Sequence, residues 1–151
     1  MRAILMAAGM GTRLRPLTEN TPKSLIEVNG MPLLERQIIN LREIGVEEII
    51  VLTGYLHEKF DDIVKKYNLI KVVNDKYDVY NNIYTMYLVR DYLKDAFVID
   101  ADNYITRNFL PKVQPKTSVY YSACKENITG EWILKYTETG RIYDVEIAPK
   151  N

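Results

Sequence analysis

The opening segment, residues 2–8, constrains the fold most, because it is a short apolar run that ends at Gly9. Such a run, without polar alternation, is typical of a strand buried on both faces of a parallel sheet. From 31 to 44, apolar residues recur at helical spacing, with Pro32 near the start and Gly45 just past the end. The sequence therefore predicts a buried strand followed by an amphipathic helix.

This alternation of strands and helices continues along the chain. Further strands are predicted at 48–53, 70–73 and 96–99, and further helices at 58–67 and 82–92. After Pro115 the pattern changes to strands at 118–124, 131–136 and 142–147, the last two joined by a turn at 138–140. We therefore predict an α/β fold, a Rossmann-like wound mixed sheet, mostly parallel, with antiparallel strands toward the C-terminus. No repeat or linker divides the chain, so we expect one domain spanning 1–151.

Composition limits the classes of partner. The chain has 20 Lys and Arg against 20 Asp and Glu, so no basic excess favours nucleic acid or an anionic membrane. No run approaches the roughly 18 to 20 apolar residues that a membrane-spanning helix needs. With a single cysteine and no secretory signal, we expect a cytoplasmic protein with a small partner. His57 and Cys124 have no partners at metal or nucleophile spacing, and we assign them no role.

A glycine-rich segment with nearby cations follows the first strand. Gly9 and Gly11 let backbone N–H groups approach an anion without a Cβ in the way. Arg13, Arg15 and Lys23 lie close by and could neutralise a triphosphate and a departing pyrophosphate. The alternative is a solvated basic loop after an ordinary glycine turn. The neighbouring cations favour a phosphate-binding cradle.

Two common phosphate-binding patterns are absent here. A dinucleotide fingerprint requires glycine where Leu14 stands, and a Walker A loop requires glycine where Pro22 stands. Residues 5–18 (LMAAGMGTRLRPLT) and 21–25 (TPKSL) instead closely resemble the signature of the nucleotidyltransferase family that includes glucose-1-phosphate thymidylyl- and uridylyltransferases. The resemblance implies that Arg13 and Lys23 hold the phosphates of a nucleotide. The nucleotide-binding residues that it implies in this region are Ala7, Ala8, Gly9, Gly11, Thr12, Arg13 and Lys23.

Two carboxylates follow the strand predicted at 96–99. Asp100 and Asp102 are two positions apart, so they lie on one side of an extended chain, at the end of the strand where ligands collect in open α/β sheets. Such oxygen ligands suit Mg²⁺. The position resembles the family's Gly-Asp-Asn metal site, with Asp102 as the metal ligand and Ala101 in place of the usual glycine. Asp100 is a second candidate ligand, or else the cap of a turn.

The segment 74–84 departs from the glutamine- and glycine-containing motifs of the sugar-phosphate members. Together with 98–104 and 131–136, it resembles the bacterial choline-phosphate cytidylyltransferases. That resemblance implies CTP as the nucleotide and phosphocholine as the acceptor, with Asn74 and Asn82 near the base. Aromatic rings bind quaternary ammonium groups, so we expect Trp132 and Tyr84, with Glu131 as an acidic helper, to bind the acceptor. Ordinary packing is the alternative for both rings.

The predicted function is Mg²⁺-dependent transfer of CMP from CTP to phosphocholine, giving CDP-choline and pyrophosphate, with Arg13, Lys23 and Asp102 as catalytic residues. One alternative is transfer to 2-aminoethylphosphonate, inositol phosphate or a sugar 1-phosphate. Another is a catalytically silent nucleotide-binding fragment. Because catalytic domains of the family are longer than this chain, we expect a C-terminally incomplete domain whose unpaired strand edges could favour self-association.

Overall fold

The computed structural model describes residues 1–80, 82–111, 115–122, 130 and 132–149. The chain divides into two compact units, Met1–Gln114 and Pro115–Asn151. That all residues form one domain stays a prediction. Among the described residues, no helix combines the length and the apolar character that crossing a bilayer requires.

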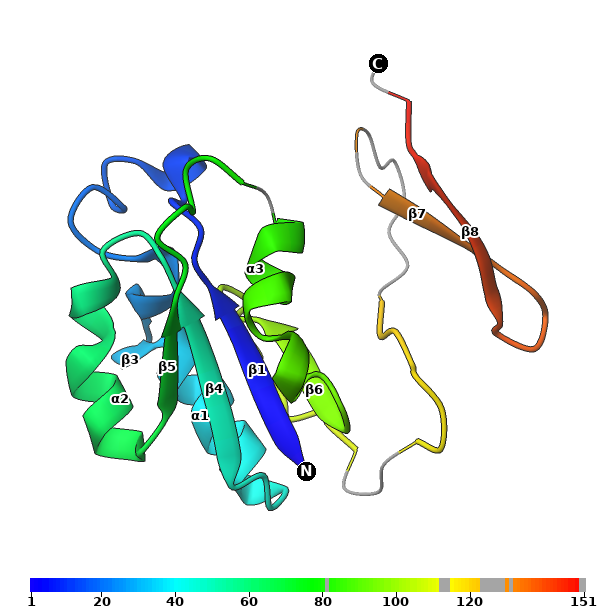
Figure 1. Cartoon of the computed structure of the whole chain (residues 1–151), viewed down its shortest axis with the longest axis horizontal. Coiled ribbons are helices and arrows are strands. Elements are labelled where there is room, and N and C mark those ends of the chain that lie inside the picture. The colour runs from blue at the N-terminus through cyan, green and yellow to red at the C-terminus, as the bar shows by residue number, and fades with distance from the viewer. Residues whose placement is uncertain (81, 112–114, 123–129, 131, 150–151) are drawn as a thin grey trace. The chain divides into compact units, whose positions relative to one another are not determined.

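Four parallel strands form the sheet of the first unit (Figure 1). They are β1 (Arg2–Ala7), β4 (Glu48–Thr53), β5 (Ile70–Val73) and β6 (Ala96–Asp100), in the order β5-β4-β1-β6. The two central strands, β1 and β4, are continuously apolar over residues 3–7 and 49–52 because helices cover both faces of the sheet. The α/β fold class and its parallel sheet are confirmed.

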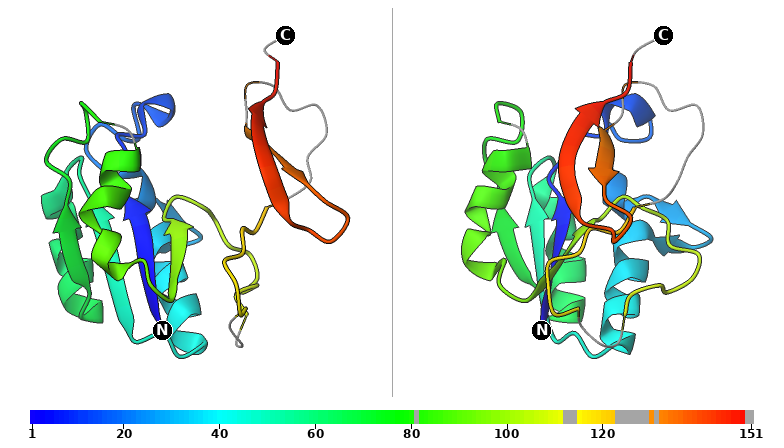
Figure 2. Two further views of the ribbon diagram at one scale, coloured as in Figure 1. Left: turned by 45° about the vertical axis from the view of Figure 1, so that its right-hand side comes forward. Right: turned by 90° about the vertical axis from the view of Figure 1, so that its right-hand side faces the viewer.

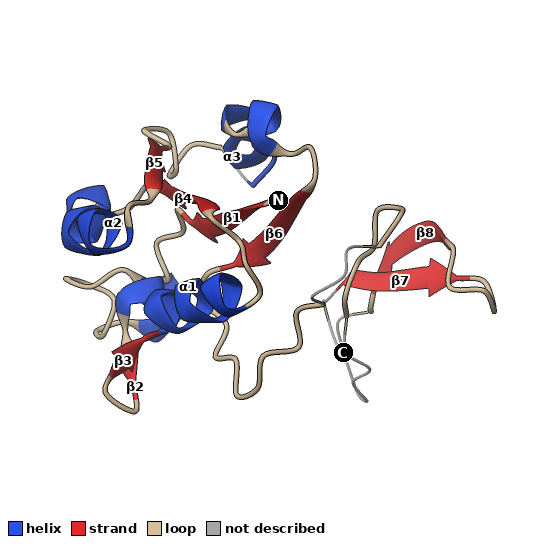
Figure 3. Ribbon diagram, turned by 90° about the horizontal axis from the view of Figure 1, so that it is seen from below, coloured by secondary structure: helices blue, strands red, loops and turns tan. Residues whose placement is uncertain are grey.

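Three helices pack on this sheet, with α1 (Leu33–Glu43) and α2 (Asp61–Tyr67) on one face and α3 (Asn82–Leu88) on the other (Figure 3). The helices predicted at 58–67 and 82–92 are each interrupted. The first begins as a 3₁₀ turn, His57–Phe60, and the second gives way to another, Arg90–Tyr92. Between α3 and that second turn, the amide of the buried Val89 bonds the carbonyl of Met86, which tightens the helix.

The strands divide the core into two clusters by their alternating side chains. On the α1 and α2 face, Ala3, Leu5 and Ala7 of β1 pack with apolar residues that include Leu34, Ile38, Leu41, Phe60 and Ile63. On the α3 face, the cluster is smaller and contains Ile4, Ile50, Leu52 and Val89. Burial on both faces fixes the register of β1, so the position of the loop that follows it is fixed as well.

A short hairpin that is absent from the predicted elements precedes α1. Its strands are β2 (Glu27–Val28) and β3 (Met31–Pro32), and its turn residues, Asn29 and Gly30, both have positive φ. The pair Asn-Gly is a strong signal for such a tight turn. The strands are too short for a periodic apolar pattern, so only the turn could have revealed them.

The second unit contains one antiparallel ribbon, β7 (Trp132–Tyr136) and β8 (Ile142–Ile147), drawn in orange and red in Figure 2. Both strands and the turn between them agree with the prediction. The strand predicted at 118–124 is wrong for 118–122, which form no strand, and its last two residues lie outside the described part. Those five residues pair with no described neighbouring strand, and an apolar pattern alone does not form one.

The two faces of this ribbon differ in chemistry. Lys135 forms ion pairs with Asp144 and Glu146 on one face. The register places apolar residues together on the other face, which carries Trp132, Leu134, Tyr136, Val145 and Ile147. Exposed apolar surface of this kind is consistent with the expected self-association, which stays a prediction.

Candidate functional site

The order of the strands places a ligand site at β1 and β6. The chain runs from β1 through β4 to β5, and then returns to place β6 on the other side of β1. The segments that leave the carboxyl ends of these two neighbouring strands therefore diverge, and a crevice between such segments is the usual ligand position in open α/β sheets. The glycine loop follows β1 and the two carboxylates follow β6, so the topology brings both predicted halves of the site together.

A cavity of about 210 Å³ lies between these segments. It is lined by Met6, Ala7, Gly9, Gly11, Thr12, Arg13, Leu14, Lys23, Ser24 and Asp102, a set we call the cradle. The backbone amides of residues 10–13 form no hydrogen bond within the described part of the chain, so they are available to an anion. The buried hydroxyl of Ser24 also lacks a described partner. The cradle thus offers hydrogen-bond donors and two cationic side chains to one ligand.

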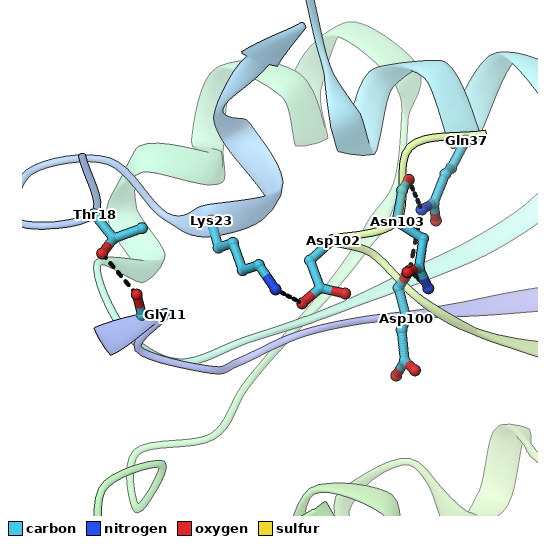
Figure 4. A network of polar contacts seen from close by, with 7 residues as sticks. All are labelled: Gly11, Thr18, Lys23, Gln37, Asp100, Asp102 and Asn103. Carbon is cyan, nitrogen blue, oxygen red and sulfur yellow. Dashed lines mark hydrogen bonds and ion pairs between the residues drawn. The ribbon is translucent and has the colours of Figure 1, made fainter. Parts of the chain in front are cut away.

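The shape of the cradle depends on Gly11. This residue has φ +62°, and a Cβ at this position would lie 3.0 Å from Cγ2 of Thr18. The fully buried Thr18 donates its hydroxyl to the carbonyl of Gly11 at 2.8 Å, which closes the loop (Figure 4). At Gly9, by contrast, a Cβ would meet no atom within 4 Å. The role of Thr18 could not be recognised from the sequence, because it depends on a contact across the loop.

Lys23 and Asp102 join the two halves of the site directly. Nζ of Lys23 lies 2.5 Å from Oδ2 of Asp102, and the two side chains are 34% and 35% exposed (Figure 4). Both were predicted separately, one as a phosphate ligand and the other as a metal ligand. In the structure each neutralises the other, and a nucleotide that bound through Lys23 would have to replace part of this pairing.

A second hollow of about 280 Å³ shares Met6, Gly9 and Asp102 with the cradle. Its other lining residues are Ala8, Thr85 and Asp100. Burial, and then the nearby charge of Asp102, raise the pKa of Asp100, although the charge of Lys23 opposes this. Two carboxylates therefore line one small space, where a cation between them would relieve their repulsion.

The donor set fits Mg²⁺ in part. Asp100 and Asp102 are hard oxygen ligands, and Mg²⁺ commonly takes one or two carboxylates and completes its shell with phosphate oxygens and water. No cluster of three acidic, histidine or cysteine side chains that could hold a metal occurs among the described residues. The described residues therefore offer two carboxylate ligands for a cation at this position.

The two asparagines predicted near the base lie differently. Asn74 is fully buried, and its side chain donates to the hydroxyl of Thr85 at 3.0 Å and accepts from the amide of Lys76 at 2.9 Å. These bonds favour a structural role, in which Asn74 positions Thr85 at the second hollow. Asn82 is the first residue of α3, and its side chain lies outside the described part. A base contact by either residue stays a prediction.

The predicted acceptor residues are divided between the two units. Tyr84 lies against Tyr80, with ring centres 4.9 Å apart and ring planes tilted by 39°, and Nζ of Lys76 lies 5.7 and 5.9 Å from the centres of these two rings. Trp132 is 70% exposed on β7, in the second unit, and Glu131 lies outside the described residues. The structure therefore brings only Tyr84 into the unit that holds the cradle.

The comparisons agree with this fold. Residues 2–119 match the family model described as nucleotidyl transferase, and the chain belongs to this family. It is 47% identical over 99% of its length to the choline-phosphate cytidylyltransferase of Streptococcus pneumoniae, and 39% identical over 93% of its length to the 2-aminoethylphosphonate cytidylyltransferase of Lancefieldella rimae.

A solved structure has a closely similar fold. The CTP:phosphocholine cytidylyltransferase from Streptococcus pneumoniae superposes with a TM-score of 0.90 over 99% of this chain, at 46% identity. The chain spans 65% of the length of that structure and of the pneumococcal relative, and 58% of the Lancefieldella enzyme. It therefore covers less than two thirds of these relatives.

Proposed function

We propose that this chain forms the nucleotide-binding part of a cytidylyltransferase that transfers CMP from CTP to phosphocholine, with CDP-choline and pyrophosphate as products. The observation that carries the proposal is the Lys23–Asp102 pair, which joins a glycine cradle to a hollow with a second carboxylate. A phosphate ligand and a metal ligand in direct contact suit a metal-bound nucleoside triphosphate. The similarity to two cytidylyltransferases supports CTP as that nucleotide.

The chemistry requires no nucleophilic side chain. A phosphate oxygen of the acceptor attacks the α-phosphorus, a new P–O bond forms, and the bond from this phosphorus to the α,β-bridging oxygen breaks. The amides of 10–13, Arg13 and Lys23 would hold the phosphates and balance the charge that moves onto pyrophosphate. Mg²⁺ held by Asp102 and Asp100 would supply further charge neutralisation.

The acceptor is an ammonium compound in this proposal. The paired rings of Tyr80 and Tyr84 already hold the ammonium group of Lys76, so they can stabilise a cation by their π faces. The extent of the similarity to the pneumococcal enzyme favours phosphocholine. Trp132 and Glu131 stay candidates for the same role.

A second candidate function is transfer to 2-aminoethylphosphonate. The cation that the tyrosine rings hold in the structure is a primary ammonium, which is the group that this acceptor would present. The similarity to the Lancefieldella enzyme supports this rival. A nucleotide-binding fragment without turnover is the third possibility, because the chain covers less than two thirds of the relatives.

The test is pyrophosphate release from CTP, UTP, dTTP or ATP with Mg²⁺, each combined with phosphocholine, 2-aminoethylphosphonate and glucose 1-phosphate. Turnover confined to CTP and phosphocholine is the expected result, and the Lys23→Ala variant serves as the control for contaminating activity. Turnover with 2-aminoethylphosphonate alone would show that this compound is the acceptor, and the role proposed for the cradle would stand. If no acceptor reacts, CTP binding measured by calorimetry would separate a nucleotide-binding fragment from a wrong assignment.

A further inference from the structure

Gln37 reaches from α1 to the carboxylate loop, although it lines neither hollow. Its side chain is 1% exposed, and Nε2 donates to the carbonyl oxygens of Asp100 and Asn103, both at 3.0 Å (Figure 4). If the side-chain amide of Gln37 were flipped, its oxygen would face two carbonyl oxygens. The two acceptors therefore determine the orientation of this amide. A buried side chain of α1 therefore forms hydrogen bonds with the backbone on both sides of Asp102.

These two hydrogen bonds help to close the turn that carries Asp102. The carbonyl of Asp100 also accepts from the amide of Asn103 at 3.4 Å, and the amide of Ala101 donates to the carbonyl of Met6 at 3.0 Å. Ala101 itself is fully buried. The backbone is therefore held before and after Asp102, while the Asp102 side chain remains free to face Lys23. A shift at either end would change the distance from Asp102 to the cradle.

Stability alone does not account for Gln37. Its Oε1 atom is buried and has no hydrogen-bond partner among the described residues. An unmet buried acceptor is unfavourable, and an apolar side chain of similar volume would remove that penalty. The unmet Oε1 offsets part of the stability that the two hydrogen bonds from Nε2 contribute, so a role in the geometry of the site accounts for Gln37 better than stability alone.

We propose that Gln37 is a positioning residue for nucleotidyl transfer, which fixes Asp102 and Asp100 relative to Lys23 without touching substrate. The inference rests on the function proposed above. It differs from the roles of Lys23 and Asp102, because Gln37 acts only through the backbone of 100–103. Its loss should therefore alter the chemical step and the loop, while nucleotide contacts in the cradle persist.

The test compares Gln37→Met, which keeps the volume and removes the donor, with Asn108→Ala as a matched control. Asn108 also ties the segment after β6 to α1, since its Nδ2 donates to the carbonyl of Asn40 at 2.9 Å, but it lies outside both hollows. The measurements are kcat and KM for CTP, the Tm, and amide hydrogen exchange of residues 101–104 by mass spectrometry.

For Gln37→Met we expect kcat to fall about 10- to 100-fold, because small misplacements of catalytic groups have effects of this size. KM for CTP should change little and exchange at 101–104 should accelerate, while the Tm should fall slightly because two buried hydrogen bonds are lost. Asn108→Ala should leave kcat unchanged. Unaltered kcat and exchange in Gln37→Met would overturn the proposal, as would a loss of kcat that follows the Tm equally in both variants.

The exchange measurement also separates this proposal from the proposed function. If the unmodified chain transfers CMP to no acceptor, the proposed function fails while exchange at 101–104 still reports on Gln37. Faster exchange in Gln37→Met, with CTP binding by calorimetry little changed, would then support the positioning role. Unchanged exchange would refute that role, whether or not the chain is active.

Discussion

Polar groups have opposite roles in two regions of the molecule. One region is the contact between α1 and α2, and the other is the cradle. Between the helices, Glu35 accepts from Nζ of Lys66 at 2.5 Å and from the hydroxyl of Tyr67 at 2.6 Å. The guanidinium of Arg42 donates to three backbone carbonyls, those of Val46, Glu47 and Tyr67. In the cradle, the Ser24 hydroxyl and the amides of 10–13 have no described partner.

This difference separates groups that hold the fold from groups that are left for a ligand. A satisfied polar network holds two helices in one arrangement, whereas unmet donors at a cavity are stabilised only when something binds. Changes in the cradle should therefore affect function more than stability, and changes between the helices the reverse.

The largest effect is expected for Lys23→Ala and Asp102→Asn, each of which should lower kcat/KM by about 10²- to 10³-fold because a charged contact in the transition state is lost. Their stability should change little, since the pair is about one third exposed. Without Mg²⁺, CTP should bind more tightly to Asp102→Asn, in which Lys23 is released, and more weakly to Lys23→Ala. Steady-state kinetics and calorimetry measure both, and normal rates in both variants would contradict the assignment.

The next effect is expected for Arg42→Ala, which should lower the free energy of unfolding by about 2 kcal/mol because hydrogen bonds from a charged donor are lost. Urea denaturation measures this change. Arg42→Lys, which keeps the charge but loses the planar fork, should give an intermediate value. CTP affinity should be unaltered in both. A loss of affinity without a loss of stability would show that the contrast between the two regions is wrong.

A smaller effect on stability is expected for Gly11→Ala, which should cost about 1–2 kcal/mol because an alanine must adopt a left-handed backbone. Its new methyl group would also crowd Thr18. Gly9→Ala is the control, because its Cβ enters open space, and it should be as stable as the unmodified chain. Gly9 lines both hollows, so this variant should still bind CTP less tightly. Equal stability of the two variants would refute the role of Gly11.

The smallest effect concerns Glu35 and pH. The hydrogen bonds from Lys66 and then Tyr67 lower the pKa of Glu35 from its usual 4.5. A lowered folded-state pKa contributes stability that is fully present above 4.5 and is lost as the pH falls through the folded value. In Glu35→Gln the free energy of unfolding should therefore depend less on pH in the acid range. This change should be smaller than the loss of stability expected for Arg42→Ala. Denaturation at pH 7 and across the acid range measures this dependence. If the free energies of unfolding of the variant and the unmodified chain run parallel with pH, this role of Glu35 is excluded.

The sequence predicted those parts of the fold that local patterns encode. β4, β5 and β8 have the predicted bounds, because each is an apolar or alternating run between breaks in the pattern. The interrupted helices and the strand missing at 118–122 depend on packing or on a pairing partner, and local periodicity does not report these. The hairpin at Asn29 and Gly30 carried a readable turn signal.

The predicted site shows the same limit. Each segment of the cradle was recognisable from its residues, and the parallel topology predicted that the segments would meet. The roles of Thr18, Gln37 and Asn74 were not recognisable, because each depends on an atom that another segment places nearby. The pairing of Lys23 with Asp102 could not be seen either, since their separation of 79 positions gives no local signal.

That separation has a consequence for how the chain becomes functional during folding. Contacts between distant segments form only after a large loop has been closed, so they come late and slowly. The cradle gains Asp102 when β6 adds to β1 as the outermost strand of the sheet. If the proposed function holds, nucleotide affinity would report completion of the sheet, and a ligand that binds only the completed site would stabilise the pairing of β6 with β1.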